Sequence, residues 1–142
     1  SQKYKTGISG NNLTINSNEK YKMFDLETDN ICIIGDQPFK VVREFHIFDV
    51  VSNIKRGCHA NRESSFLMYC TNGTCKVSYD TGYKRETVEL GRGKLFFLNK
   101  MVWKEMFDFS EGAILSVLSD KLYDSKEYIR DYDAYIEMMK EK

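Results

Sequence analysis

The sequence contains one proline, two histidines and no apolar run approaching the length of a membrane-spanning helix, which needs about 20 predominantly apolar residues. Its first residues lack the apolar centre of a secretory signal. Basic and acidic residues balance at 21 each, so the chain has no excess positive charge to attract nucleic acid or an anionic membrane. We therefore expect neither nucleic acid nor a membrane among its partners.

The cysteines form no C-x-x-C pair, which is the usual signature of zinc-binding and redox sites. They are Cys32, Cys58, Cys70 and Cys75. This pattern favours reduced thiols in a cytoplasmic protein, and a disulfide is the alternative.

Aromatic residues are plentiful, with nine Phe, nine Tyr and one Trp, and they supply bulky material for a core. A length of 142 residues suits one domain, and no low-complexity linker divides the chain. We predict a single domain over residues 1–142. Its β-barrel should cover about residues 19–123, and a C-terminal helix about residues 124–140.

Short β-patterned segments separated by turns fill most of the chain. They are 21–26, 30–34, 39–51, 66–70, 75–79, 85–90, 95–98 and 113–118. The pair Asn72-Gly73 predicts a hairpin between the two segments that flank it. The continuous apolar runs 95–98 and 113–118 are typical of strands buried on both faces. Together these features predict an all-β fold, an antiparallel barrel or double-sheet jelly roll, which can hold a small ligand in its mouth.

The end of the chain has helical spacing instead. Asp124 is a candidate N-cap, with Glu127 three residues later as its partner in a capping box. A stripe at helical spacing follows, formed by Tyr128, Tyr132, Tyr135, Ile136 and Met139. We predict a helix from about Ser125 to Met139 that packs against the barrel outside the ligand cavity.

His59 lies between two β-patterned segments, where a small barrel places its site. One imidazole beside the amide of Asn61 is a poor site for a first-row metal. We therefore predict no bound metal and no other cofactor. The alternative for His59 itself is a polar residue on the barrel rim without a function.

His46 alternates with Phe45 and Ile47 along a predicted strand, so its side chain points away from theirs. It faces the cavity if the apolar pair faces the other way, and a core or surface histidine is the alternative. Arg43 and Arg56 flank the same region. They can clamp a diphosphate through bidentate contacts, or they are ordinary solvated arginines.

Trp103 and Glu105 are two residues apart and therefore lie on one face of an extended segment. A tryptophan beside a carboxylate suits a platform for a sugar or a base. A core tryptophan with a nearby ion pair is the ordinary alternative.

Three blocks of the sequence carry a family resemblance when taken in order. They are residues 56–61 (Arg-Gly-Cys-His-Ala-Asn), 101–106 (Met-Val-Trp-Lys-Glu-Met) and 123–133. They resemble the cupin-fold sugar 3,4-ketoisomerases, and the similarity extends over roughly residues 19–135. The resemblance implies a cupin jelly roll and a metal-independent dTDP-4-keto-6-deoxyhexose 3,4-ketoisomerase that works through an enediol. It also implies a homodimer and a role in deoxysugar biosynthesis for a glycan such as lipopolysaccharide or an S-layer.

The chain departs from the family pattern at positions that bear on the chemistry. The family motif reads Arg-Gly-x-His-Ala-His, so its first histidine matches His59, and Asn61 replaces the second. Lys104 stands where the family has a histidine between Trp and Glu, and Phe45-His46 replace a pair of tyrosines. A histidine transfers protons near neutral pH, whereas an amide only donates and accepts hydrogen bonds.

His59 is therefore the first candidate for proton transfer, with His46 and Lys104 as candidates for a second transfer. The expected substrate-binding residues are Arg43, Arg56, Asn61, Trp103 and Glu105. The first alternative function is a family member that binds a nucleotide sugar but catalyses a different step or none. A carbohydrate-binding or structural module without turnover is the second alternative.

Overall fold

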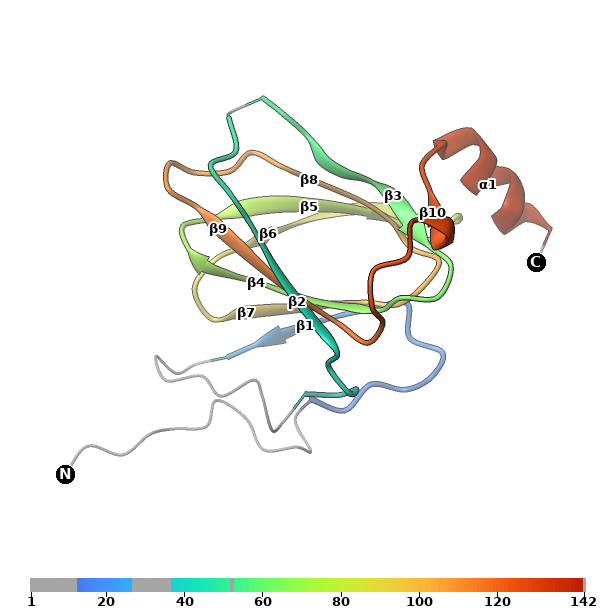
Figure 1. The fold of residues 1–142 in the computed structure, drawn as a ribbon, viewed down its shortest axis with the longest axis horizontal. Helices are drawn as coiled ribbons and strands as arrows, with labels where there is room; N and C mark the ends of the chain where they lie inside the picture. Colours follow the sequence, from blue (N-terminus) through green and yellow to red (C-terminus); the bar gives the residue numbers. More distant parts are fainter. Residues whose placement is uncertain (1–12, 27–36, 52, 142) are drawn as a thin grey trace.

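The structure is a computed structural model that describes residues 13–26, 37–51 and 53–141. The strand predicted over residues 30–34 lies outside the described residues, as does Cys32. The described part forms two antiparallel five-stranded sheets that pack face to face, with one helix near the C-terminus (Figure 1). This confirms the predicted double-sheet jelly roll.

The first sheet has the strand order β1-β7-β4-β9-β2, and the second has the order β10-β3-β8-β5-β6. The strands of the first sheet are β1 (Tyr21–Asp25), β7 (Lys94–Leu98), β4 (Phe66–Asn72), β9 (Ile114–Ser119) and β2 (Arg43–Phe48). Those of the second are β10 (Tyr128–Ile129), β3 (Arg56–Asn61), β8 (Trp103–Phe107), β5 (Cys75–Asp80) and β6 (Arg85–Leu90). Strand β2 is the edge strand of the first sheet. The next strand along the chain, β3, belongs to the second sheet.

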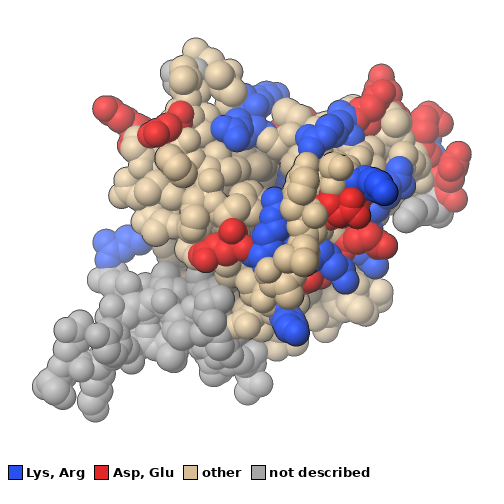
Figure 2. Space-filling view, in the orientation of Figure 1, with Lys and Arg blue, Asp and Glu red and all other residues tan. Residues whose placement is uncertain are grey.

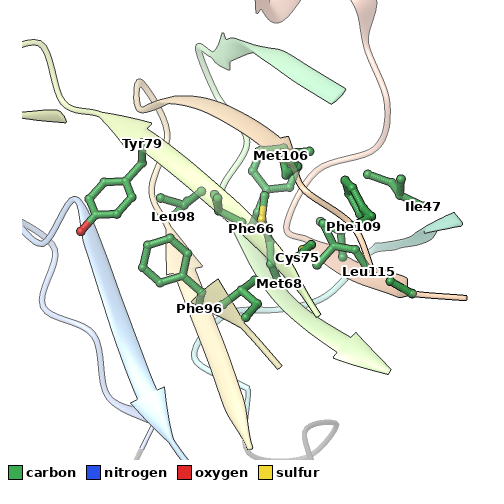
Figure 3. Close-up of a cluster of buried hydrophobic side chains, with 14 of the residues drawn as sticks. Ile47, Phe66, Met68, Cys75, Tyr79, Phe96, Leu98, Met106, Phe109 and Leu115 are labelled. Carbon is green, nitrogen blue, oxygen red and sulfur yellow. The ribbon is translucent and has the colours of Figure 1, made fainter. Parts of the chain in front are cut away.

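The strands β7 and β9 are buried along nearly their whole length, as their continuous apolar runs predict. One face of each strand contributes to the core between the sheets, which contains Phe96 and Leu115 (Figure 3). The other face packs into a second apolar cluster with Phe24 and Leu26, where Phe97 and Leu118 lie. Burial on both faces therefore explains the loss of the usual alternation of polar and apolar residues.

The predicted hairpin between residues 66–70 and 75–79 is wrong. Strand β4 pairs with β7 and β9, whereas β5 pairs with β6 and β8, so the turn at Asn72-Gly73 carries the chain from one sheet to the other. Gly73 has a φ of +70°, and a Cβ there would lie 2.9 Å from Cα of Ala113. The turn residues were thus read correctly, but a local pattern does not specify which strand will pair with which.

The C-terminal helix α1 covers Tyr132–Lys140, with Asp131 as its N-cap. The prediction of a helical start at about Ser125 is wrong. Asp124 caps only a short 3-10 turn, η2 (Ser125–Glu127), and the next two residues form β10 against β3. The predicted stripe is confirmed within α1 itself, because Tyr135 and Met139 are buried against the outside of the second sheet.

No helix among the described residues is long and apolar enough to cross a membrane. On the face shown in Figure 2, acidic and basic side chains are interspersed rather than gathered into one extended patch of a single sign. This face therefore agrees with the balanced composition.

Candidate active site

A cavity of about 350 Å³ opens between the two sheets. Its lining comes from β2 and β4 of the first sheet, from β3 and β8 of the second, and from the segment around β10. The lining residues are Arg43, Phe45, His46, Ile47, Arg56, Gly57, His59, Phe66, Met68, Lys104, Met106, Tyr123, Tyr128 and Arg130. A jelly roll typically binds a small ligand at this position.

A β-bulge in β3 places His59 in this cavity. The pairing of β3 with β8 shifts register between Gly57 and His59, and both Gly57 (φ +81°) and Cys58 (φ +57°) adopt the left-handed conformation. A Cβ on Gly57 would lie 2.9 Å from Sδ of Met106, so only glycine fits without displacement. Because a bulge re-aims the side chain that follows it, His59 ends directly opposite Lys104 of β8.

The imidazole of His59 is packed rather than solvated. Its ring centroid lies 4.7 Å from that of Tyr128, and Nδ1 is buried without a well-formed hydrogen bond to any described residue. Burial and the neighbouring charge of Lys104 lower the pKa of His59 to about 4. The ring is therefore neutral near pH 7 and can accept a proton.

Lys104 is unusual for a lysine because its side chain is buried and only 1% exposed. Its Nζ donates a hydrogen bond of 3.1 Å to Oδ1 of Asn61 and lies 4.7 Å from the ring centroid of Phe66. Burial lowers the pKa of Lys104 to about 7, although the carboxylate of Glu127 opposes this shift. A lysine that titrates near neutral pH can give or take a proton.

Glu127 is a site residue that the sequence prediction missed. Its carboxylate is buried and accepts hydrogen bonds from the backbone N–H groups of Glu63 (2.9 Å) and Ser64 (3.0 Å) and from the Ser64 hydroxyl. Burial raises the pKa of Glu127, but these hydrogen bonds outweigh it and hold the pKa below its usual value. Glu127 therefore supplies a fixed negative charge near Lys104.

Three arginines line the cavity, and no acidic side chain among the described residues forms an ion pair with any of them. Arg43 stacks 4.4 Å from the ring centroid of Phe45 and donates a 3.4 Å hydrogen bond to the hydroxyl of Tyr128. Arg130 lies 4.7 Å from the ring centroid of Tyr128, and Arg56 begins β3. Uncompensated guanidinium groups at one cavity are suited to binding an anion such as a diphosphate.

His46 is one of the residues at the cavity wall, but its imidazole points to the other face of β2. There Nδ1 lies 2.7 Å from the hydroxyl of Ser116, and Nε2 lies 3.7 Å from Glu44. Arg43, Phe45 and Ile47 are the residues of this strand that face the cavity or the core. The structure therefore does not bring the two histidines together.

Trp103 and Glu105 also lie on the face of β8 that is turned away from the cavity, because Lys104 and Met106 occupy the inner face. The Trp103 ring is 3% exposed and packs 5.2 Å from the ring centroid of Tyr132. Its Nε1 donates a hydrogen bond of 2.8 Å to Glu105. The same-face relation predicted for this pair is confirmed, but the pair faces the C-terminal helix.

The predicted residues at the cavity are thus Arg43, Arg56, His59 and Lys104, and Asn61 lies buried behind Lys104. Tyr123, Tyr128 and Arg130 also line the cavity, and Glu127 acts on Lys104 through its charge; none of these four was predicted as a site residue. The signal for these four lay in the block at residues 123–133, whose spacing was interpreted as helical.

The fold and the cavity define a cupin-type jelly roll with a ligand site between its sheets. Residues 11–140 match the family model described as "FdtA: WxcM-like, C-terminal". The chain belongs to this family.

Named relatives are similar along much of the chain. A TDP-4-oxo-6-deoxy-α-D-glucose-3,4-oxoisomerase from Aneurinibacillus thermoaerophilus is 34% identical over 99 residues, which are 69% of this chain and 71% of the relative. The structure of the TDP-fucose-3,4-ketoisomerase WlaRA from Campylobacter jejuni has a TM-score of 0.76 and 32% identity, covering 85% of this chain and 96% of that one. The TDP-quinovose 3,4-ketoisomerase WlaRB from the same organism has a TM-score of 0.76 and 31% identity, covering 84% and 98%.

The described residues contain no group of three or more His, Cys, Asp or Glu side chains that could hold a metal ion. The absence of a bound metal stays a prediction.

Proposed function

We propose that the protein is a dTDP-4-keto-6-deoxyhexose 3,4-ketoisomerase. The observation that carries this proposal is the pairing of His59 with Lys104 in one cavity, because the reaction needs groups that exchange protons. The membership of the family and the activities named for its relatives support the same substrate class.

The reaction moves a carbonyl from C4 to C3 of the sugar. In the first half, C3 loses its proton to neutral His59 while O4 gains a proton from solvent, which forms an enediol. In the second half, O3 loses its proton to solvent and C4 gains one from the ammonium form of Lys104. A proton passes back from His59 to Lys104, directly or through solvent, so the net change is an isomerisation without an oxidant.

The remaining lining residues can position the substrate. Arg43, Arg56 and Arg130 supply the charge for the diphosphate, and the Tyr128 hydroxyl supplies a hydrogen bond at the same rim. Asn61 does not transfer protons, and it orients the Lys104 amine. The site needs no metal in this scheme, because the buried ammonium stabilises the developing oxyanion.

The test is incubation with dTDP-4-keto-6-deoxyglucose in D2O, followed by NMR. We expect deuterium at C3 of recovered substrate or at C4 of the product, and we expect His59→Asn to abolish most of it. Binding of the sugar nucleotide without any exchange contradicts the proposal and indicates a family member that binds but does not isomerise.

We also propose a homodimer and a cytoplasmic location. Strand β2 is an edge strand, and exposed apolar side chains lie along it and in the segment that follows: Val42, Phe48, Val51 and Ile54. Such a surface is suited to pairing with a second copy. Sedimentation of a stable monomer at micromolar concentration contradicts the dimer, and cell fractionation tests the location.

A further inference from the structure

Two of the cysteines lie next to each other although they belong to different sheets. Cys70 is part of β4 in the first sheet, and Cys75 begins β5 in the second. The turn at Asn72-Gly73 carries the chain from one sheet to the other, so it brings the two side chains together. Their Sγ atoms are 3.7 Å apart, and both thiols are free.

The two thiols differ in their surroundings. Cys75 is only 1% exposed and lies in the apolar core between the sheets (Figure 3), whereas Cys70 is half-buried and packs against that core. The contact with Cys75 lowers the pKa of Cys70, although burial opposes this shift. The same contact, together with burial, raises the pKa of Cys75. Cys70 is therefore the thiol that a solute reaches and that ionises first, and Cys75 stands beside it as a resolving thiol.

The contact is close enough for a covalent bond to follow from a small movement. The sulfur atoms of a disulfide are about 2.05 Å apart, so the two Sγ atoms must approach each other by roughly 1.7 Å. All four residues between the cysteines are exposed. The pairing of β4 with β9 is also irregular between Cys70 and Asn72. The connecting segment can therefore adjust while the two side chains rotate.

We propose that Cys70 and Cys75 form a dithiol site that a small-molecule disulfide, such as oxidised glutathione, converts into a disulfide between the two sheets. The Cys70 thiolate attacks one sulfur of the oxidant, which forms a mixed disulfide and releases one glutathione thiolate. Cys75 then gives its proton to water, and its sulfur attacks Sγ of Cys70 and releases the second glutathione. The protein loses two electrons and two protons, and the oxidant gains them as two thiols.

This site is separate from the proposed active site, because neither cysteine lines the cavity. The inference therefore stands whether or not the protein is an isomerase. In a reducing compartment the pair stays a dithiol, and it closes when the glutathione pool becomes oxidised.

The experiment treats the folded, reduced protein with oxidised glutathione, alkylates the remaining thiols and maps the peptides by mass spectrometry. Cys32→Ser serves as the background, because it removes the cysteine outside the described residues. We expect Cys70 and Cys75 to become linked and resistant to alkylation, with recovery of both thiols after dithiothreitol. Cys58 is the internal control, because it is half-buried and its pKa is raised by burial. A disulfide that involves Cys58, or a link that forms only after unfolding in urea, overturns the inference.

A pair of variants tests the two roles. Cys75→Ala keeps the attacking thiol and removes the resolving one, so we expect a lasting glutathione adduct on Cys70. Cys70→Ser leaves only the buried thiol of the pair, so we expect no adduct on Cys75. An adduct on Cys75 in that variant contradicts the assigned roles. If Cys75→Ala does not fold, rapid quenching of the reaction with the Cys32→Ser protein gives the same information, because a transient adduct must appear on Cys70 before the disulfide does. A disulfide that forms through an adduct on Cys75 contradicts the proposed order.

Discussion

Nζ of Lys104 donates a 3.1 Å hydrogen bond to Oδ1 of Asn61, and both side chains are buried. These are the two positions at which the chain carries an amine and an amide in place of the family's histidines. Because they contact each other, the two departures form one coupled unit: the amide accepts the hydrogen bond that the buried amine must donate.

This contact predicts non-additive effects of restoring the histidines. Asn61→His alone places an imidazole against the Lys104 amine, and Lys104→His alone replaces the long amine that donates to Asn61 with a shorter imidazole. We expect the double variant to retain more isomerase activity than the two single effects predict when added, with a coupling of roughly 0.5–3 kcal/mol. Additive effects in a double-mutant cycle contradict the coupling.

Removal of either proton-transfer group should slow catalysis. A positioned general acid or base contributes about 10²–10⁴ in rate, so we expect losses of this size for His59→Asn and Lys104→Met. Lys140→Met is the matched control, because Lys140 lies exposed on α1. The measurement is C3 exchange in D2O, and full activity of either site variant shows that the group is not used.

The buried Lys104 should lower the free energy of unfolding of the protein. Its pKa of about 7 in the folded state lies below its value of 10.5 in the unfolded chain, so the unfolded state binds more protons between these values. Stability therefore rises with pH across this window. We expect Lys104→Met to be more stable than wild type below pH 7, by up to about 5 kcal/mol, with the advantage vanishing as pH rises toward the unfolded pKa. Urea unfolding at about pH 6 and about pH 9 tests this, and a less stable variant at the lower pH contradicts it.

Glu127 should control the pH at which Lys104 acts. The charged group that bears on this amine is Glu127, whose negative charge favours the ammonium form. Glu127→Gln should therefore lower the pKa of Lys104 and move the high-pH loss of kcat/KM to lower pH. Ser64→Ala is the control, because it removes one hydrogen bond to the carboxylate but keeps the charge. A pH profile that moves equally in both variants indicates a structural effect only.

The strands of the barrel were predictable because burial and turn chemistry act locally. The apolar run of β9 and the glycine at residue 73 both appear in the sequence at the place where they act. The pairing of β4 with β9 rather than β5 depends on contacts between residues far apart in the chain, and no local pattern contains that information.

The candidate site was likewise predictable only in part from the sequence. The resemblance directed attention to His59 and Lys104, and both line the cavity, but the face of each strand was decided by register. A one-residue change of register exchanges the inner and outer faces, which is why Trp103 and Lys104, adjacent in sequence, lie on opposite sides of β8. Glu127 was assigned to a helix because its capping role was plausible locally, whereas tertiary packing uses its carboxylate to accept hydrogen bonds from Ser64.

The last prediction concerns nucleotide binding. It compares a residue that lines the cavity with a residue on the outer face of β8. Arg56 lines the cavity, and losing a charged hydrogen bond costs on the order of 2–3 kcal/mol. We therefore expect Arg56→Ala to weaken dTDP binding by roughly 30- to 150-fold in calorimetric titration.

Trp103→Phe is the informative comparison, because the indole of Trp103 packs on Tyr132 and donates a hydrogen bond to Glu105 outside the cavity. It should lower the free energy of unfolding by about 1–3 kcal/mol and leave the dTDP affinity unchanged. Weaker binding in the folded Trp103 variant, with normal binding in the Arg56 variant, places the nucleotide on the outer face of β8 instead.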